Sequence, residues 1–344
     1  MRLSTAGLAV VLAGFGFTAQ AQQQITGAGA TFPAPVYTKW GEAAKAAIAI
    51  QLNYQAIGSG GGQNQILNRT VDFGASDAPM DPAKLQSGNL LQFPTVMGAV
   101  VAIVNIPGVA IDKMRLTGDT LANIYLGKIT KWNDAAIAKL NPGVSLPNLA
   151  IAPVYRADGS GTSFVYTSYL STVSPEWKDK VGAATSVSWP AGSGAKGNDG
   201  VAATVHNTRG GIGYVENAYA TQNKLVTTQL QNKAGNFVAP TNKSFMAAAS
   251  AGDWTHAQNY AVSLINLPGE GAWPIVSPTF IELPKNPTDA THSANVIKFF
   301  DWAYKNGSAA AEQLEYIPLP EAVQTAVRAS WKAEVKGPDG KAIY

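Results

Sequence analysis

The sequence of 344 residues contains no cysteine. This absence excludes disulfide bonds, thiolate metal ligands and cysteine nucleophiles. Histidine is almost as scarce, because only His206, His256 and His292 occur, far apart and in no spacing typical of metal ligands. Hydrolytic chemistry on a serine needs an activating base or a metal ion, and the sequence offers no evident candidate for either. We therefore expect no metal and no cofactor.

Charged side chains make up only 14% of the chain, and no cluster of one sign stands out. Without Arg2, which lies in a leader described next, 24 of the 25 basic side chains remain against 22 acidic ones, a net charge of +2. Nucleic-acid and membrane surfaces require a clustered basic patch, so neither partner is expected. Any anion site must be local.

No apolar run is long enough to span a membrane. The run near the N-terminus, residues 6–17, follows Arg2 and precedes the small-residue pattern Ala-Gln-Ala at 19–21. This is the pattern of a signal peptide, so we interpret residues 1–21 as a leader and expect export of a mature chain that starts near Gln22. A membrane anchor is the alternative, but the run is too short to cross a bilayer and no stop-transfer charges follow.

The full sequence of 344 residues is 46% hydrophobic, which excludes a disordered chain and supports sizeable cores. A chain this long exceeds the usual size of one core, so two lobes are expected. Strand-like and helix-like segments alternate, which indicates an α/β fold. The predicted strands are 51–57, 150–155 and 211–215, and the predicted helices are 33–47, 160–170, 290–305 and 319–332.

Two strongly apolar stretches, 93–106 and 273–283, are long for simple strands and contain or adjoin Gly or Pro. We interpret them as crossovers between lobes. One lobe then comprises residues 22–96 and 272–344, and the other comprises residues 97–271. Long buried strands inside a single sheet would give the same pattern, so that alternative stays open.

The segment 26–35, TGAGATFPAP, leads into an amphipathic helix. Thr is a good helix cap and Pro suits the first helical position, so the helix is expected to start at Thr31 or Phe32. The free amides of a helix N-terminus attract anions. Alone, however, the segment is also typical of an ordinary strand-to-helix turn with a capping Thr.

A second junction is IGSGGGQ at 57–63, where Ser59 follows a strand and precedes the helical segment 64–68. Its glycines allow backbone to approach a ligand, and Ser59 adds a hydroxyl. The segment is neither a Walker A loop nor a Rossmann turn, because the required Lys-Ser or Lys-Thr pair and glycine spacing are absent.

The third junction is YRADGSGTSF at 155–164, a strand end followed by a turn and a helix that begins at Ser160. It offers a guanidinium, hydroxyls and free amides, and the planar fork of Arg156 suits a tetrahedral oxyanion. The alternative is a surface pair between Arg156 and Asp158 next to a capping Ser. Three such junctions together favour an anion site held by convergent helix N-termini.

The segment 72–79, DFGASDAP, is a short strand that ends in a small-residue turn containing Asp77. An Asp in such a turn most often bonds its own backbone, so Asp77 alone predicts nothing.

Together, GAGATFPAPVYTKW, IGSGGGQNQI, TVDFGASDAPM and RADGSGTSF closely resemble the periplasmic phosphate-binding proteins of phosphate-specific ABC transporters. The resemblance continues through FPTVMGAVVAIVNIPG, WPAGSGAKGNDGVAATV, GIGYVE and KFFDWAYKNG, so it covers nearly the whole mature chain. It implies an α/β, two-lobed periplasmic binding protein fold of type II, with crossover strands joining the lobes and the ligand in the cleft between them.

The resemblance also implies which residues contact phosphate: Thr31, Phe32, Ser59, Asp77, Arg156, Ser160, Gly161 and Thr162. Phe32 and Gly161 would act through backbone amides, the hydroxyl residues through their side chains as well, and Arg156 as the charged donor. Asp158 would pair with Arg156 and steady it.

The function implied is binding of inorganic phosphate with high affinity in the periplasm and its delivery to the permease and ATPase subunits of an importer, by a protein that is a monomer before docking. No enzymatic activity is expected. Two alternatives stay open: a binding protein for another oxyanion, and a phosphomonoesterase with Ser59 or Ser160 as nucleophile. Asp77 separates the oxyanions, because protonated phosphate can donate a hydrogen bond to a carboxylate and sulfate cannot.

Overall fold

The structure is a computed structural model that describes residues 23–111, 113–254 and 257–344. The predicted signal peptide, residues 1–21, lies outside the described residues. Within these three ranges, no helix combines the length and the apolar character needed to cross a membrane.

One sheet path runs through the molecule in the order β2-β1-β3-β11-β4-β8-β6-β7. At one end, β1 (Gln23–Gly29) pairs in parallel with β2 (Ile50–Ala56) and β3 (Phe73–Ser76). We call the elements around these strands the first lobe. Its helices are α1 (Ala34–Ile48), α2 (Ser59–Leu67), α3 (Pro82–Ser87), α11 (Ala290–Asn306), α12 (Ser308–Gln313) and α13 (Glu321–Glu334).

At the other end, β8 (Gly211–Glu216) pairs in parallel with β6 (Ala152–Arg156), which pairs with β7 (Ser193–Ala195). Beside them, β9 (Val226–Gln231) pairs with β5 (Met114–Leu116) and β10 (Phe237–Val238). These strands define the second lobe. Its helices are α4 (Gly118–Tyr125), α5 (Ala135–Leu140), α6 (Gly161–Val173), α7 (Pro175–Lys180), α8 (Gly197–Asn207), α9 (Asn217–Gln222) and α10 (Asn242–Ala249).

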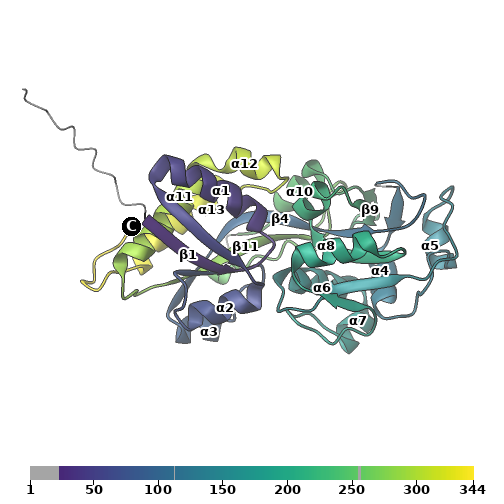
Figure 1. The fold of residues 1–344 in the computed structure, drawn as a ribbon, viewed down its shortest axis with the longest axis horizontal. Helices are drawn as coiled ribbons and strands as arrows, with labels where there is room; N and C mark the ends of the chain where they lie inside the picture. The colour runs from purple at the N-terminus through teal and green to yellow at the C-terminus, as the bar shows by residue number, and fades with distance from the viewer. Residues whose placement is uncertain (1–22, 112, 255–256) are drawn as a thin grey trace, which may run out of the picture.

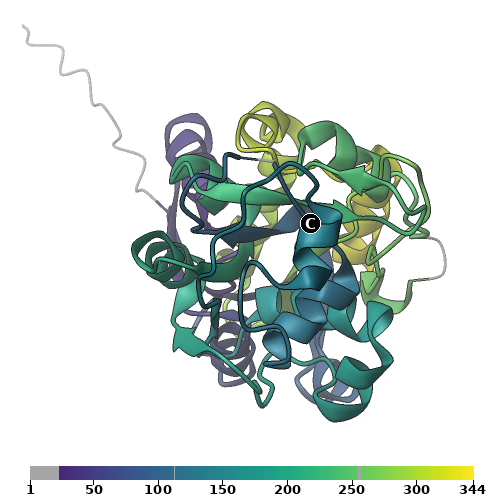
Figure 2. The ribbon, with the colours of Figure 1, turned by 90° about the vertical axis from the view of Figure 1, so that its right-hand side faces the viewer.

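Figure 1 shows the two lobes side by side along the long axis, and Figure 2 looks onto the second lobe, where helices lie around the central strands. The lobes are joined by β4 (Leu90–Val104) and β11 (Val276–Pro284), every residue of which is buried. The first part of β4 pairs with β11, and its last five residues pair with β8. Of the two predicted crossover segments, β4 therefore pairs with strands of both lobes, whereas β11 pairs with β3 and β4 and is reached by the chain from the second lobe. The proposed lobe boundaries at residues 96 and 272 stay a prediction.

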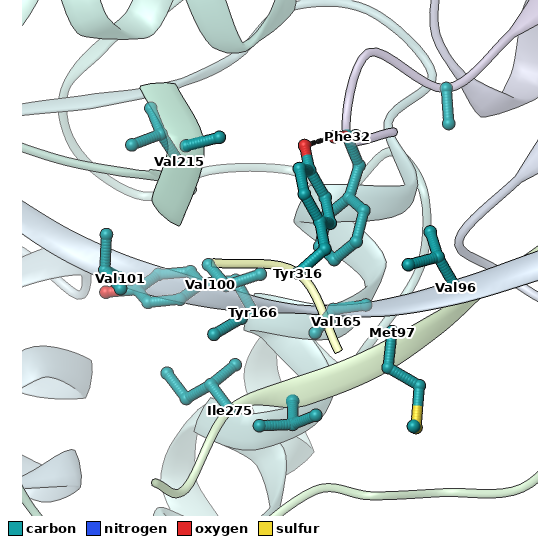
Figure 3. Close-up of a cluster of buried hydrophobic side chains, with 14 of the residues drawn as sticks. Phe32, Val96, Met97, Val100, Val101, Val165, Tyr166, Val215, Ile275 and Tyr316 are labelled. Atoms are coloured by element: carbon teal, nitrogen blue, oxygen red, sulfur yellow. Dashed lines mark hydrogen bonds between the residues drawn. The ribbon is translucent and has the colours of Figure 1, made fainter. Parts of the chain in front are cut away.

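The apolar core continues across this junction. Figure 3 shows buried side chains of β4 next to others from both lobes: Val96, Met97, Val100, Val101, Val165, Tyr166, Val215, Ile275 and Tyr316. Phe32 lies edge-on against Tyr316, with ring centroids 6.3 Å apart. The segment before α1 is thus packed into the same core as the crossover strands.

The predicted strands and helices occur within about three residues of the expected positions, but two predicted helix starts are wrong. First, α1 begins at Ala34 with Pro33 as its N-cap, so neither Thr31 nor Phe32 starts it and Thr31 does not cap it. Second, α2 begins at Ser59, not at residue 64. Its glycines allow tight packing on β1, since a Cβ at Gly62 would lie 2.5 Å from the Ala28 carbonyl oxygen.

Candidate functional site

The three junctions found in the sequence come together where the lobes meet. Ser59, the first residue of α2, accepts a hydrogen bond at Oγ from the amide of Gly161 in α6 (3.0 Å). Next to it, the amide of Gly60 donates to the carbonyl of Gly159 (2.9 Å). Thr31, which precedes α1, contacts the second lobe twice: its hydroxyl accepts from Asn198 Nδ2 (2.7 Å), and its carbonyl accepts from the Tyr219 hydroxyl (2.6 Å). All of the sequence-predicted ligand residues in these segments are buried.

Gly161 lies so close to the first lobe that only glycine fits. A Cβ at this position would lie 2.4 Å from Ser59 Oγ and 2.5 Å from Asp77 Oδ2, well inside van der Waals contact. The same serine oxygen also accepts the amide of Asp77 (3.2 Å). Ser59, Asp77 and Gly161 therefore form one tight cluster that spans both lobes.

Arg156 is a buried cation at the end of β6, with a side chain only 1% exposed. Its Nε and Nη2 donate to the two carboxylate oxygens of Asp158 at 2.8 and 2.5 Å, a bidentate pair. The remaining Nη1 donates to the hydroxyl of Thr162 (3.3 Å). The predicted pairing of Arg156 with Asp158 is present, and the alternative of a surface pair is wrong because the guanidinium is buried.

Asp158 is held ionised by its donors. Partial burial acts to raise its pKa, but the hydrogen bonds and charge of Arg156, together with the amide of Gly197 (3.1 Å), bring the pKa below its ordinary value. Both Asp158 oxygens accept from Nε and Nη2 of Arg156. The third nitrogen, Nη1, therefore donates to Thr162. The pair thus fixes the guanidinium plane, as a charged donor for an anion requires.

Asp77 differs from Asp158, because its carboxylate has an unfilled acceptor. Oδ1 accepts from the hydroxyl of Thr279 (2.8 Å), whereas Oδ2 is buried and has no hydrogen-bond partner among the described residues. Burial raises the pKa of Asp77 to about 7. The Thr279 hydrogen bond and the charge of Arg156 act in the opposite direction and lower this pKa, but burial has the larger effect. The interpretation of Asp77 as a turn residue that only bonds its own backbone does not hold.

Ser160 caps α6, which begins at Gly161, by accepting the amide of Ser163 at its Oγ (3.0 Å); the capping Ser of the alternative interpretation is therefore present. Phe32 has a buried ring, and its carbonyl accepts from the hydroxyl of Tyr316 (2.6 Å; Figure 3). The role of the Phe32 amide as a ligand donor stays a prediction, as do the ligand contacts of the other seven residues.

Sequence reasoning missed Asn198, a fully buried residue in the first turn of α8. Its side-chain amide donates to the hydroxyls of Thr31 (2.7 Å) and Thr162 (3.1 Å). The signal was present, because the segment GAKGNDG is a fourth glycine-containing start of a helix. No group of three or more His, Asp or Glu side chains that could hold a metal occurs in the described parts of the chain.

The fold and this cluster define a class. A sheet shared by two lobes through two crossover strands, with polar groups from both lobes meeting between them, is the architecture of a two-lobed, type II binding protein. Residues 18–306 match the family model of the PBP superfamily domain, so the chain belongs to that superfamily.

Within the superfamily, the chain belongs to the family of PstS phosphate-binding proteins. It is 51% identical to the phosphate-binding protein PstS of Pasteurella multocida over 98% of both chains. It is 49% identical to that of Haemophilus influenzae over 91% of this chain and 93% of the relative. In fold, it resembles a phosphate-binding protein from Stenotrophomonas maltophilia, with a TM-score of 0.69, 21% identity and coverage of 93% and 98%.

Proposed function

We propose that this protein binds inorganic phosphate between its lobes and delivers it to the membrane subunits of an ABC-type importer. One observation carries the proposal: the carboxylate oxygen Asp77 Oδ2 is buried without a partner among the described residues, next to Gly161 and under the influence of the Arg156 charge. The donors that we propose for the ligand are the guanidinium of Arg156 and the amides or hydroxyls of the other predicted residues: Thr31, Phe32, Ser59, Ser160, Gly161 and Thr162. The Gly161 amide, which donates to Ser59 Oγ here, would turn to the ligand. Many donors and one acceptor suit a tetrahedral anion that still carries a proton.

Phosphate near neutral pH fits this arrangement because it is both an anion and a hydrogen-bond donor. Its proton can fill Asp77 Oδ2, and its other oxygens can accept from the surrounding donors. Sulfate brings no proton, so it would leave two like charges desolvated at hydrogen-bond distance. The named relatives, which are called phosphate-binding proteins, support the same ligand.

The phosphomonoesterase alternative finds no support in the surroundings of the two candidate nucleophiles. Ser59 Oγ accepts two backbone amides and Ser160 Oγ accepts one, and no described histidine lies near either residue. His292 contacts Asp72 on the first lobe, and His206 is exposed near the end of α8. We therefore propose a receptor without a chemical step.

We further propose that the mature chain works in the periplasm as a monomer before docking, and that the permease and ATPase subunits are its partners. The leader pattern of residues 1–21 and the names of the relatives support this part of the proposal. No nucleic-acid partner is proposed, because the chain lacks a strong basic excess.

Isothermal titration of the chain from residue 22 onward tests the ligand, with phosphate, arsenate and sulfate as separate titrants. We expect one phosphate per chain, bound tightly, and no heat from sulfate at concentrations far above those that saturate with phosphate. Arsenate, which is protonated like phosphate, should compete. A phosphatase assay with and without added divalent metal should show no turnover. No phosphate binding, or turnover of a phosphate ester, would overturn the proposal.

A further inference from the structure

Asn198 makes hydrogen bonds whose direction can be assigned without ambiguity. The backbone amide of Glu216 donates to Asn198 Oδ1 (3.0 Å), and an N–H group can only donate. The atom facing it must therefore be the side-chain oxygen. It follows that the side-chain nitrogen, Nδ2, faces the hydroxyls of Thr31 and Thr162 and donates to both.

The donors around Thr31 Oγ1 then show that Asn198 does not use the hydroxyl hydrogen of Thr31. Its Oγ1 accepts from Asn198 Nδ2 (2.7 Å) and also from the Asn198 backbone amide (3.2 Å). A hydroxyl oxygen has two acceptor sites and one hydrogen. Both acceptor sites are filled by donors from the second lobe, so the hydrogen is left to donate elsewhere.

The same count applies to Thr162. Its Oγ1 accepts from Asn198 Nδ2 (3.1 Å) and from Arg156 Nη1 (3.3 Å), two groups that cannot accept in return. The Thr162 hydrogen is therefore also free to donate. One asparagine side chain thus directs a hydroxyl from each lobe, since Thr31 precedes α1 and Thr162 lies in α6.

We propose that Asn198 is a positioning residue that makes the hydroxyls of Thr31 and Thr162 donors toward the bound anion, and so adds to affinity and selectivity without touching the ligand. This inference rests on the proposed phosphate-binding function. An acceptor at position 198 would have the opposite effect: both hydroxyl hydrogens would turn to it, and hydroxyl lone pairs would face the anion. Because Asn198 contacts Thr31 across the lobes, it also favours the arrangement in which the lobes touch.

The test compares Asn198→Asp, Asn198→Ala and wild-type protein by isothermal titration with phosphate. Asn198→Asp has nearly the same shape but accepts where Asn donates, and we expect phosphate affinity to fall by about a hundredfold or more, the scale of two lost hydrogen bonds to a charged group. Asn207→Asp is the matched control, since it makes the same charge change on the exposed end of the same helix, and its affinity should equal that of wild type.

A double-mutant cycle separates positioning from general damage to the site. If Asn198 acts through the Thr31 hydroxyl, Asn198→Ala should cost clearly less affinity in a Thr31→Val background than in wild type. A purely structural role predicts equal losses in both backgrounds. The cycle uses no new charge, and circular dichroism of the ligand-free variants checks that each is folded.

Wild-type affinity for Asn198→Asp, or additive losses in the cycle, would overturn the inference while leaving the proposed function intact. Absence of phosphate binding by the wild-type chain would instead overturn the proposed function. The two failures are therefore distinguishable in the same set of titrations.

Discussion

The hydroxyl oxygen of Ser59 lies 3.0 Å from the amide nitrogen of Gly161, although 102 residues separate them in the chain. The bond crosses from the first lobe to the second and sits beside the backbone bond between Gly60 and Gly159. Both contacts exist only when the lobes touch. A ligand that binds among these groups must therefore favour the closed arrangement over any open one.

The first prediction is that phosphate closes the molecule in solution. The proposed ligand residues come from both lobes, so their joint contacts to one ion exist only when the lobes approach each other. Small-angle X-ray scattering should show a smaller radius of gyration with saturating phosphate than without it. Sulfate at the same ionic strength is the control, and identical curves with and without phosphate would contradict the prediction.

A methyl group at Gly161 should prevent both closure and binding. In Gly161→Ala, the new Cβ would lie 2.4 Å from Ser59 Oγ and 2.5 Å from Asp77 Oδ2, and the buried surroundings leave little room to relax. We expect phosphate affinity to fall by at least about a hundredfold, in line with overpacking costs of ~1–3 kcal/mol plus lost ligand bonds. Gly271→Ala is the control, because nothing lies within 4 Å of its added Cβ.

Arg156→Lys should weaken phosphate binding although the charge is kept. Lysine cannot reproduce the fork that engages Asp158 with two nitrogens and leaves a third for Thr162 and the anion. The loss of a charge-assisted hydrogen bond is worth roughly 1 to 3 kcal/mol, or about five- to a hundredfold in affinity. Isothermal titration calorimetry measures the phosphate affinity, and the exposed Arg115→Lys is the control. Unchanged affinity would place Arg156 outside the ligand's reach.

Asp77 should decide between phosphate and sulfate. In Asp77→Asn, the amide supplies a donor in place of the unpartnered Oδ2, so sulfate should gain affinity and phosphate should lose it. Competition titrations measure the ratio, and Asp81→Asn is the control because Asn caps α3 as well as Asp does. If the Asn variant excludes sulfate as strongly as wild type, the selectivity lies elsewhere in the site.

The same residue predicts a pH dependence of selectivity. Burial raises the pKa of Asp77 to about 7, so below that pH the carboxyl of the ligand-free protein gains a proton and becomes a donor. Competition by sulfate should therefore strengthen as the pH falls from 8 to 5 in wild type. In Asp77→Asn, which does not titrate, the change over this range should be much smaller. Equal pH profiles would rule out Asp77 as the source.

Glu282 on β11 should make stability fall with rising pH. Its carboxyl is fully buried, Gln63 is its only side-chain donor among the described residues, and burial raises its pKa to about 8 from an ordinary value of 4.5. A raised pKa means that the folded state holds the proton more tightly, so this stabilisation is complete below about pH 4 and is lost as pH rises through 8.

Glu282→Gln removes this titration. The melting temperature of the ligand-free variant should fall less between pH 5 and pH 8 than that of wild type, because the amide stays neutral throughout. Glu42→Gln, an exposed change on α1, is the control and should follow wild type. Parallel curves for Glu282→Gln and wild type would show that Glu282 does not titrate in this range.

The sequence predicted the features that depend on residues close together in the chain. The amphipathic faces of α1, α11 and α13 follow from apolar spacing, and Ser160 caps α6 through a bond three residues away. Thr31 shows where such rules fail. By local preference it caps the next helix, but its hydroxyl is held by Asn198, 167 residues away, and the helix starts at Ala34.

The sequence also did not predict which carboxyl groups are buried. Glu282 lies in a predicted apolar stretch and Glu216 follows a predicted strand, but only the sheet, in which β11 and β8 lie next to β4, shows that both side chains are fully buried. The alternating pattern of strands and helices predicted the α/β class. The resemblance to a family predicted the ligand residues, whose contacts stay a prediction. Asn198 was missed although it lies in one of the segments that carry the resemblance, because its partner Thr31 is 167 residues away.

The strand β11 also bears on the order in which the chain can fold. It lies between β3 and β4, but it comprises residues 276–284 and so is made after about four fifths of the chain. Until it inserts, the edges of β3 and β4 lack their neighbour and the first lobe has no complete sheet. Such distant pairings make folding slow, because the entropy cost of closing a long loop precedes any stabilising contact. A nascent chain that ends before residue 276 therefore cannot assemble the native first lobe.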